Sequence, residues 1–266
     1  MSAPYSHRLR IAAAVLMAAL ALLGGCRSRN DTRRMNAVQL YDTAHKAMLG
    51  NDFEYAIRQY EALTARFPFT SQARQARLDL IYVYYRKGET ESAIDAADQF
   101  LRENPTHPRV DYAWYMKGLT NFERTPWAIE RWFGVDMAKR PPTTAQKAIT
   151  AFNTVVTQYP NSDYAYDSLR RMTYLRNRLA EYEIYVARWY VKRGAWVAAA
   201  QRANDVVEQY DGAPAVPEAL QIEIQSYHQL GFNELAANAQ RVYDLNFPHG
   251  PPRPPVGKRW WQFWRH

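Results

Sequence analysis

The sequence is poor in cysteine and glycine, and neither glycine nor proline is abundant enough for a repetitive protein. A single Cys in 266 residues permits no internal disulfide and no multi-cysteine metal site, so disulfide-stapled and zinc-held folds are excluded. Eleven Gly and fifteen Pro make up about a tenth of the chain, which excludes collagen-like and low-complexity proteins. The chain is instead 47% hydrophobic and 14% aromatic, which is enough to bury a sizeable core in one or two domains.

The one Cys lies at the end of an N-terminal targeting segment. A short basic stretch from His7 to Arg10 precedes an apolar run over residues 11–23, which is shorter than the roughly 20 residues that span a bilayer. The run therefore favours an export signal, residues 1–25, over a transmembrane anchor. The residues LGGC that end at Cys26 resemble the lipobox of bacterial lipoproteins. This resemblance implies cleavage before Cys26, a covalent diacylglycerol and an N-acyl lipid on that residue, and no other cofactor.

The formal charge of +8 is unevenly distributed along the chain. The excess of basic residues lies at the two ends, in residues 1–34 and 249–266, whereas residues 35–248 are close to neutral. A neutral folded part offers no basic face to a phosphate backbone, so nucleic acid is not expected as a partner. Basic ends beside a lipid anchor are better explained by attraction to anionic lipid, and we expect residues 26–34 to form a flexible linker to the membrane.

A repeat runs through the rest of the chain. Five alanines stand the same number of residues before a Pro or Asp that ends a segment. The pairs are Ala56 with Pro68, Ala93 with Pro105, Ala148 with Pro160, Ala199 with Asp211, and Ala236 with Pro248. This pattern resembles the second helix of a tetratricopeptide repeat (TPR), in which Ala admits a neighbouring helix closely and Pro stops the chain. We therefore predict an all-α TPR solenoid of five helix-turn-helix repeats.

Glycines and prolines refine this prediction within the repeats. Gly88, Gly194 and Gly231 stand at one fixed distance before their alanines and predict the turns between paired helices. The third repeat carries an insertion, Arg124 to Thr144, whose three prolines predict a loop or short helix. In the fourth repeat, residues 161–193 contain neither Gly nor Pro, which predicts one long helix or a tightly jointed pair, capped by Ser162.

Several stretches resemble the TPR lipoproteins of the outer-membrane β-barrel assembly (BAM) machinery. They are RFPF at 66–69, LDLIYVYY at 78–85, NPTHP at 104–108, DYAWYMKGL at 111–119, WFGVD at 132–136, YPNS at 159–162 and RGAWV at 193–197. The resemblance runs from the lipobox to about Pro248 and includes the length of the insertion. It is lost in the loop 137–144, so the resemblance assigns no contact to that loop, and Asp211 replaces the fourth repeat's Pro.

The resemblance implies a non-enzymatic assembly factor, anchored by lipid in the outer membrane and facing the periplasm. Such a protein binds unfolded outer-membrane protein precursors and docks on the POTRA domains of the central barrel subunit, beside accessory BAM lipoproteins. Arg27 after the Cys, in place of the Asp that retains lipoproteins at the inner membrane, agrees with this location. A TPR lipoprotein scaffold of another envelope system, such as pilus or cell-wall assembly, is the alternative.

The resemblance implies that residues 35–123 form a substrate groove and that residues 124–248 dock on a partner. TPR proteins line their concave groove from the first helix of each repeat. The corresponding residues here are Tyr41, His45, Met48, Leu78, Tyr82, Tyr85, Tyr115, Leu119 and Phe122. The same residues also suit an ordinary core, because the tyrosines at 82, 84 and 85 cannot all face one way on a helix. The docking residues implied by the resemblance are Arg188, Arg193, Gly194, Ala195 and Trp196.

Motifs for catalysis are absent from the sequence. Neither G-x-S-x-G nor H-E-x-x-H occurs, and the six His residues are scattered, so we predict no enzyme and no metal site. Gly250, Gly257 and Lys258 have the wrong spacing for a phosphate-binding loop. An active site assembled only in three dimensions stays open at this stage.

The tail, residues 249–266, matches no part of the family pattern. Four prolines between 251 and 255 prevent helix continuation, and Trp260, Trp261 and Trp264 follow among basic residues. Three interpretations stay open: the tail caps the last repeat, docks at the membrane interface, or binds another subunit.

Overall fold

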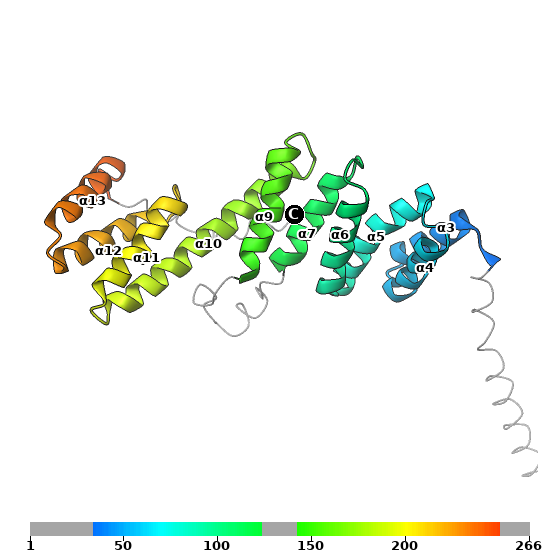
Figure 1. Ribbon diagram of the computed structural model, residues 1–266, viewed down its shortest axis with the longest axis horizontal. Coiled ribbons are helices and arrows are strands. Elements are labelled where there is room, and N and C mark those ends of the chain that lie inside the picture. The colour runs from blue at the N-terminus through cyan, green and yellow to red at the C-terminus, as the bar shows by residue number, and fades with distance from the viewer. Residues whose placement is uncertain (1–33, 124–142, 251–266) are drawn as a thin grey trace, which may run out of the picture. The chain divides into compact units, whose positions relative to one another are not determined.

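The computed structural model describes residues 34–123 and 143–250, and these form ten α-helices without a strand. The predicted all-α architecture is therefore confirmed for this part of the chain. The chain divides into two compact units, Met1–Pro105 and Thr106–His266. Figure 1 shows the helices of each unit packed side by side along the chain. Across residues 34–123 and 143–250 the helices make five consecutive pairs, as the repeat predicts.

The N-terminal unit contains the first two pairs. Its helices are α3 (Ala37–Leu49), α4 (Phe53–Arg66), α5 (Ser71–Lys87) and α6 (Thr90–Glu103). Each helix packs on the next, and the first helices of the two pairs, α3 and α5, also touch. Leu40, Tyr60, Leu63 and Val83 from α3, α4 and α5 form the centre of its core. Asn36 caps α3 through a reciprocal side-chain bond with Gln39.

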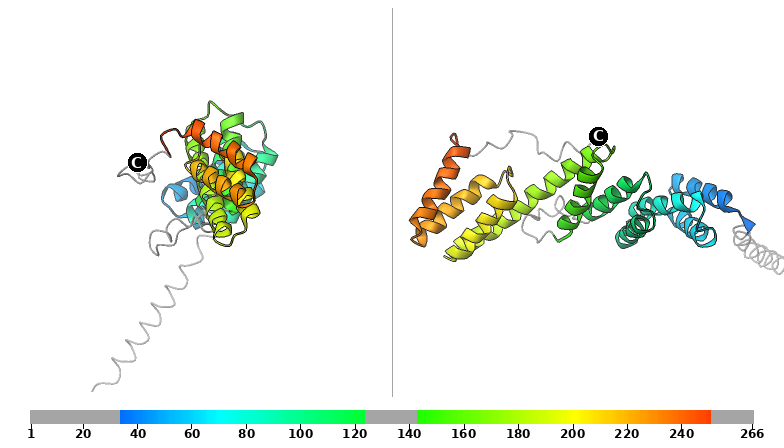
Figure 2. Two further views of the ribbon diagram at one scale, coloured as in Figure 1. Left: turned by 90° about the vertical axis from the view of Figure 1, so that its left-hand side faces the viewer. Right: turned by 45° about the horizontal axis from the view of Figure 1, so that its top comes forward.

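The C-terminal unit contains three pairs built around one long helix. Its helices are α7 (Val110–Glu123), α9 (Thr143–Gln158), α10 (Ala165–Val191), α11 (Trp196–Gln209), α12 (Val216–Gln229) and α13 (Asn233–Asn246). Helix α10 packs on α9, α11 and α12, and Figure 2 shows it as the longest helix of the unit. The predicted long helix of the fourth repeat is therefore a single helix of 27 residues.

The repeat alanines lie where two helices approach most closely. All five of them, Ala56, Ala93, Ala148, Ala199 and Ala236, are fully buried. Gly118 of α7 serves the same purpose from the facing helix, because a Cβ there would lie 2.6 Å from the ring of Phe152 on α9. Small residues at these points allow the helix backbones to come together, which is the reason that the spacing is repeated.

The glycines predicted to make turns have the backbone conformation that the prediction requires. Gly88, Gly194 and Gly231 have φ angles of 82°, 69° and 75°, in the left-handed region that other residues enter only at a cost. Each of them follows the first helix of its pair. The predicted positions of these turns are therefore confirmed.

Two details of the sequence prediction need correction. Ser162 does not cap α10, because the helix begins at Ala165 and the Ser162 hydroxyl instead accepts from the backbone N–H of Tyr164 and donates to Asp111. The insertion was predicted to end at Thr144, but α9 already begins at Thr143.

Several predicted features lie outside the described residues. They are the signal 1–25, Cys26, most of the linker 26–34, the insertion up to residue 142 and the tail beyond Gly250. Among the helices within residues 34–123 and 143–250, none combines the length and apolar composition needed to cross a bilayer. The unit boundary falls before α7, so the residues predicted to line one groove belong to two units.

Candidate functional site

In the N-terminal unit, three predicted groove residues gather around a buried tyrosine that the sequence did not single out. Tyr60 of α4 is fully buried, and its hydroxyl lies 3.5 Å from Nδ1 of His45 and 3.9 Å from Sδ of Met48. Tyr41 stacks on His45 with ring centroids 5.6 Å apart, and its ring lies 5.9 Å from that of Tyr60. The sequence analysis therefore grouped three residues that do lie together, but it did not identify Tyr60, which they surround.

A carboxylate fixes this group to the next repeat. The Tyr41 hydroxyl donates to Oδ2 of Asp79 on α5 at 2.9 Å, and the Gln75 amide donates to Oδ1 at 2.9 Å. Burial raises the pKa of Tyr41 and Tyr60, and the negative charge of Asp79 raises both further. Both phenols therefore stay protonated, and the Tyr41 proton is committed to Asp79. We call Tyr41, His45, Met48, Tyr60 and Asp79 the tyrosine cluster.

The second set of groove candidates on α5 divides between core and surface. Leu78 is 2% exposed, so it is a core side chain and the prediction that it lines a groove is corrected. Tyr82 is half-buried, and the Arg86 guanidinium donates to its hydroxyl and lies over its ring and over that of Phe53. Tyr85 is also half-buried. Tyr82 and Tyr85 are therefore partly accessible at the surface.

The groove candidates of α7 form a similar group within the C-terminal unit. Tyr115 stacks on Tyr164 with centroids 4.7 Å apart, and its hydroxyl donates to Oδ2 of Asp167 on α10 at 2.8 Å. Arg171 pairs with the same carboxylate oxygen at 2.5 Å. Burial raises the pKa of Tyr115 to about 12, although the positive charge of Arg171 works against the rise.

The remaining two candidates of α7 have different surroundings. Phe122 is half-buried, with the Arg171 guanidinium 4.9 Å from its ring centroid and the Tyr174 ring 5.7 Å away. Leu119 is 8% exposed and belongs to the core, which corrects its assignment to a groove. Half-buried aromatic residues therefore form a separate surface on each unit, and the sequence could not distinguish them from core positions next to them.

The turn between α10 and α11 carries the residues implied in docking. The Arg193 guanidinium lies 3.6 Å from the ring centroid of Trp189, one turn earlier on α10, and Trp189 and Val197 are exposed. Gly194 makes the turn, and the N–H of Ala195 donates to the Tyr190 carbonyl. We call Trp189 and Arg193 the tryptophan patch, and Val197 is exposed on the helix that follows. The sequence analysis missed Trp189, although it stands four residues before Arg193.

The two other predicted docking residues are engaged within the unit. Arg188 makes a two-pronged hydrogen-bonded pair with the carboxylate of Glu218, which joins α10 to α12. Trp196, the first residue of α11, is half-buried. Arg188 therefore has a role within the fold while its side chain stays 55% exposed, and Trp189 gives the docking candidate its exposed aromatic ring.

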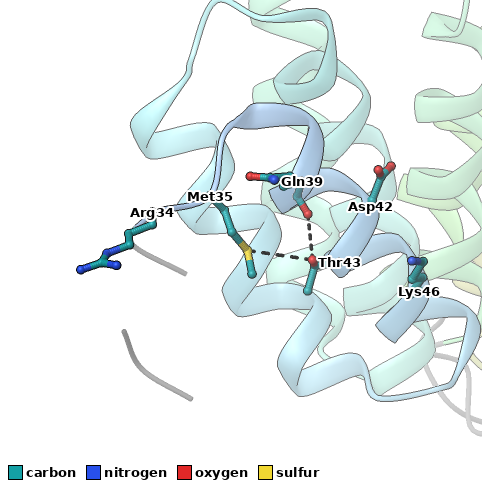
Figure 3. Close-up of a pocket in the computed structure, with 6 residues that line it drawn as sticks. All are labelled: Arg34, Met35, Gln39, Asp42, Thr43 and Lys46. Atoms are coloured by element: carbon teal, nitrogen blue, oxygen red, sulfur yellow. Dashed lines mark hydrogen bonds between the residues drawn. The ribbon is translucent and has the colours of Figure 1, made fainter. Parts of the chain in front are cut away.

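A shallow hollow marks the start of α3 and is shown in Figure 3. It is lined by Arg34, Met35, Gln39, Asp42, Thr43 and Lys46. Thr43 donates to the Gln39 carbonyl at 2.8 Å and contacts Sδ of Met35 at 4.0 Å. Its side chains carry both signs of charge, and over residues 34–123 and 143–250 no group of His, Cys, Asp and Glu is placed to hold a metal ion.

Paired helices with repeat alanines at their contacts and glycine turns between them define a protein of the TPR class. The family model YfiO, described as outer membrane lipoprotein, matches residues 33–242. The outer membrane protein assembly factor BamD of Neisseria meningitidis serogroup A is 36% identical, over 88% of this chain and 89% of that protein. The chain belongs to this family, the BamD assembly factors.

Further relatives cover similar shares of the chain. BamD of Xylella fastidiosa strain Temecula1 is 36% identical over 93% of this chain and 85% of that protein. BamD of Vibrio cholerae is 36% identical over 86% of this chain and 95% of that protein. The similarity therefore includes both units and is not confined to a generic repeat.

Proposed function

We propose that this protein is a non-enzymatic assembly factor that is tethered to the outer membrane by lipid on Cys26. It holds unfolded β-barrel precursors on the aromatic surfaces of its helices and docks on the POTRA domains of the barrel subunit, together with accessory lipoproteins. The observation that carries the proposal is the family membership over both units. The relatives are named as assembly factors of outer membrane proteins, which supports the same location and role here.

The tryptophan patch is the part of the C-terminal unit best suited to docking. Trp and Arg dominate the energetics of protein interfaces, and here an exposed Trp is held under a guanidinium at the end of a rigid helix. Both side chains are preorganised, so little conformational entropy is lost when a partner binds. The other residues around the turn, Gly194 and Ala195, fix its backbone.

The chain offers a matched control for this docking surface. Near the other end of α10, Arg170 lies over the exposed ring of Tyr166 at the same spacing in sequence, with its guanidinium 5.8 Å from the centroid, a looser pair than Arg193 and Trp189 at 3.6 Å. We expect Trp189→Ala and Arg193→Ala each to weaken binding of the isolated POTRA domains about 30-fold, the loss typical of a 2 kcal/mol hot spot. Tyr166→Ala and Arg170→Ala should change it less than about threefold. Equal effects of the two pairs would contradict docking at the patch.

The aromatic surface of the N-terminal unit is tested by capture of a urea-unfolded β-barrel protein. Tyr82→Ala with Tyr85→Ala should reduce capture more than it lowers the melting temperature, because both rings are partly accessible. Tyr84 of the same helix is the control, since its hydroxyl donates to Glu61 of α4 at 2.6 Å. Tyr84→Ala should mainly lower stability, and the reverse ranking would show that Tyr82 and Tyr85 serve the core.

The lipid anchor is tested separately. Cys26→Ala should leave the helices intact and release the protein from membranes, because the anchor is covalent and lies ahead of the fold. Fractionation of envelopes and circular dichroism of the released protein measure the two outcomes. Membrane retention of the variant would contradict an anchor at Cys26.

A further inference from the structure

The outer face of the last helix is apolar. Leu235, Val242 and Leu245 of α13 are 46%, 42% and 81% exposed, and their spacing places them on one side of the helix. The adjacent side of the helix, with Ala236 and Ala239, is buried. The outer face of a terminal repeat is normally polar, because no further repeat covers it. An apolar stripe at this position therefore indicates that something covers it.

One residue of the stripe stands at a position that faces the following repeat elsewhere in the chain. Leu245 follows Ala236 by the same number of residues as Glu208 follows Ala199 on α11, and Glu208 acts electrostatically on Glu223 of the next helix, α12. Arg241, which lies earlier on α13, also has a counterpart that touches the following helix. Arg241 stands where Glu61 stands on α4, and Glu61 accepts a hydrogen bond from Tyr84 of the next helix, α5.

The turn that ends α13 has the same backbone conformation as two turns that lead into a following helix. Phe247 has φ −130° and ψ 54°, close to the −132° and 52° of Phe67 and the −123° and 40° of Tyr210. In each case the backbone N–H three residues later donates to the carbonyl of that aromatic residue. After Phe67 and Tyr210 the chain enters α5 and α12, which pack on the helix just completed. The turn at Phe247 therefore has the backbone geometry of the turns that precede α5 and α12.

The composition and length of that segment fit the face. It contains Trp260, Trp261, Phe263 and Trp264, and its basic residues Lys258 and Arg259 complement Glu234, which lies on the same side of α13 as the stripe. Extended chain from Gly250 to Trp260 reaches up to about 33 Å, whereas the 14 residues of α13 span about 21 Å. The aromatic residues can therefore reach any point on the stripe.

We propose that residues 251–266 fold back over α13 and cover Leu235, Val242 and Leu245 with their tryptophan rings. The segment takes the place of the first helix of a sixth repeat. Its prolines prevent it from being a copy of that helix, so it acts as a cap that ends the array instead of extending it.

Hydrogen exchange measured by mass spectrometry tests the cap on the chain from residue 26 with Cys26→Ser. Replacing Trp260, Trp261 and Trp264 by Ser should speed amide exchange in residues 233–246 by at least about tenfold, because the covering side chains are lost. Trp189→Ser, which removes an exposed Trp elsewhere in the unit, is the control and should leave exchange in α13 unchanged. Unchanged exchange in the triple variant would overturn the proposal.

A variant of the helix face separates contact from indirect effects. Leu245→Ser should also speed exchange in α13, and adding it to the triple Trp variant should add little, because both remove one contact. Ala237→Ser, an exposed position outside the stripe, controls for the change in helix propensity. Fully additive effects would contradict direct contact. If the Trp residues are needed only for binding to phosphatidylglycerol vesicles and α13 is unaffected, the tail is a membrane anchor and the cap is wrong.

Discussion

The two units contain the same contact in two electrostatic settings. In the N-terminal unit Tyr41 donates to Asp79, and in the C-terminal unit Tyr115 donates to Asp167. Each bond joins the first helix of one repeat to the first helix of the next. The second partner differs, because Asp79 is held by the neutral amide of Gln75 whereas Asp167 is paired with Arg171.

This difference shows how a repeat protein can vary the strength of one contact without changing its geometry. The Asp167 carboxylate balances a cation whose side chain is only 17% exposed, so losing the carboxylate leaves a partly buried charge alone. Asp79 balances no comparable cation among its hydrogen-bond partners, so its loss leaves only neutral donors unsatisfied. The contact is therefore an ion-pair network in one unit and, in the other, a carboxylate held by neutral donors.

A third carboxyl extends the comparison and gives the largest expected effect. Glu223 of α12 is buried, and Glu208 faces it with the same sign of charge where Arg171 faces Asp167 with the opposite sign. Burial first and Glu208 second raise the pKa of Glu223 to about 7, although a hydrogen bond with Tyr227 lowers it somewhat.

The folded state therefore binds a proton on Glu223 more tightly than the unfolded chain does. Stability from this group is complete below the unfolded pKa near 4.5 and is lost as the pH rises toward 7, by about 3 kcal/mol. Urea unfolding of the C-terminal unit at several pH values measures the loss. Glu223→Gln should remove this part of the pH dependence, and a profile identical to that of the unchanged protein would show that another group is responsible.

The second-largest expected effect tests the comparison between Asp167 and Asp79 directly. Asp167→Ala should destabilise the protein by about 2 kcal/mol and Asp79→Ala by about 1 kcal/mol, because only the first leaves a partly buried cation without its partner. Urea unfolding followed by circular dichroism measures both. Equal losses would mean that Arg171 is solvated well enough to need no carboxylate.

The smallest expected effect comes from removing the tyrosine hydroxyls, and here the N-terminal unit should lose more stability than the C-terminal unit. Tyr115→Phe should cost about 0.5 kcal/mol, since Asp167 keeps its bond to Arg171, whereas Tyr41→Phe should cost about 1 kcal/mol, since Asp79 keeps only the Gln75 amide. The same unfolding experiment measures it. A larger loss for Tyr115→Phe would show that the hydroxyl, and not the arginine, dominates the bond in the C-terminal unit.

The sequence was most informative where one residue type alone satisfies a local geometry. Ala199 and Ala236 mark close helix contacts because larger side chains do not fit there, and Gly88 and Gly231 mark turns because of their positive φ. Such requirements recur at fixed spacings within each repeat, so they can be seen without a structure. The helix pairs, their order and the long α10 follow from them.

The candidate site was predicted less well because it depends on contacts between helices that are distant in sequence. Tyr60 and Asp79 complete the tyrosine cluster from α4 and α5, and only the rotation of those helices brings them to Tyr41. Arg188 looks like a free docking residue until Glu218 is found beside it. A carboxylate within the apolar stretch at 78–81 was the one signal that could have indicated Asp79.

Helix α10 belongs to two cores at once. Leu175 packs in one with Phe152 of α9, whereas Ile184 and Ala187 pack in another with α11 and α12. The helix is about 40 Å long and has no internal joint within its 27 residues, so it acts as a stiff lever. Because the helix is continuous, a force applied at Trp189 would reach Asp167, which lies near the opposite end.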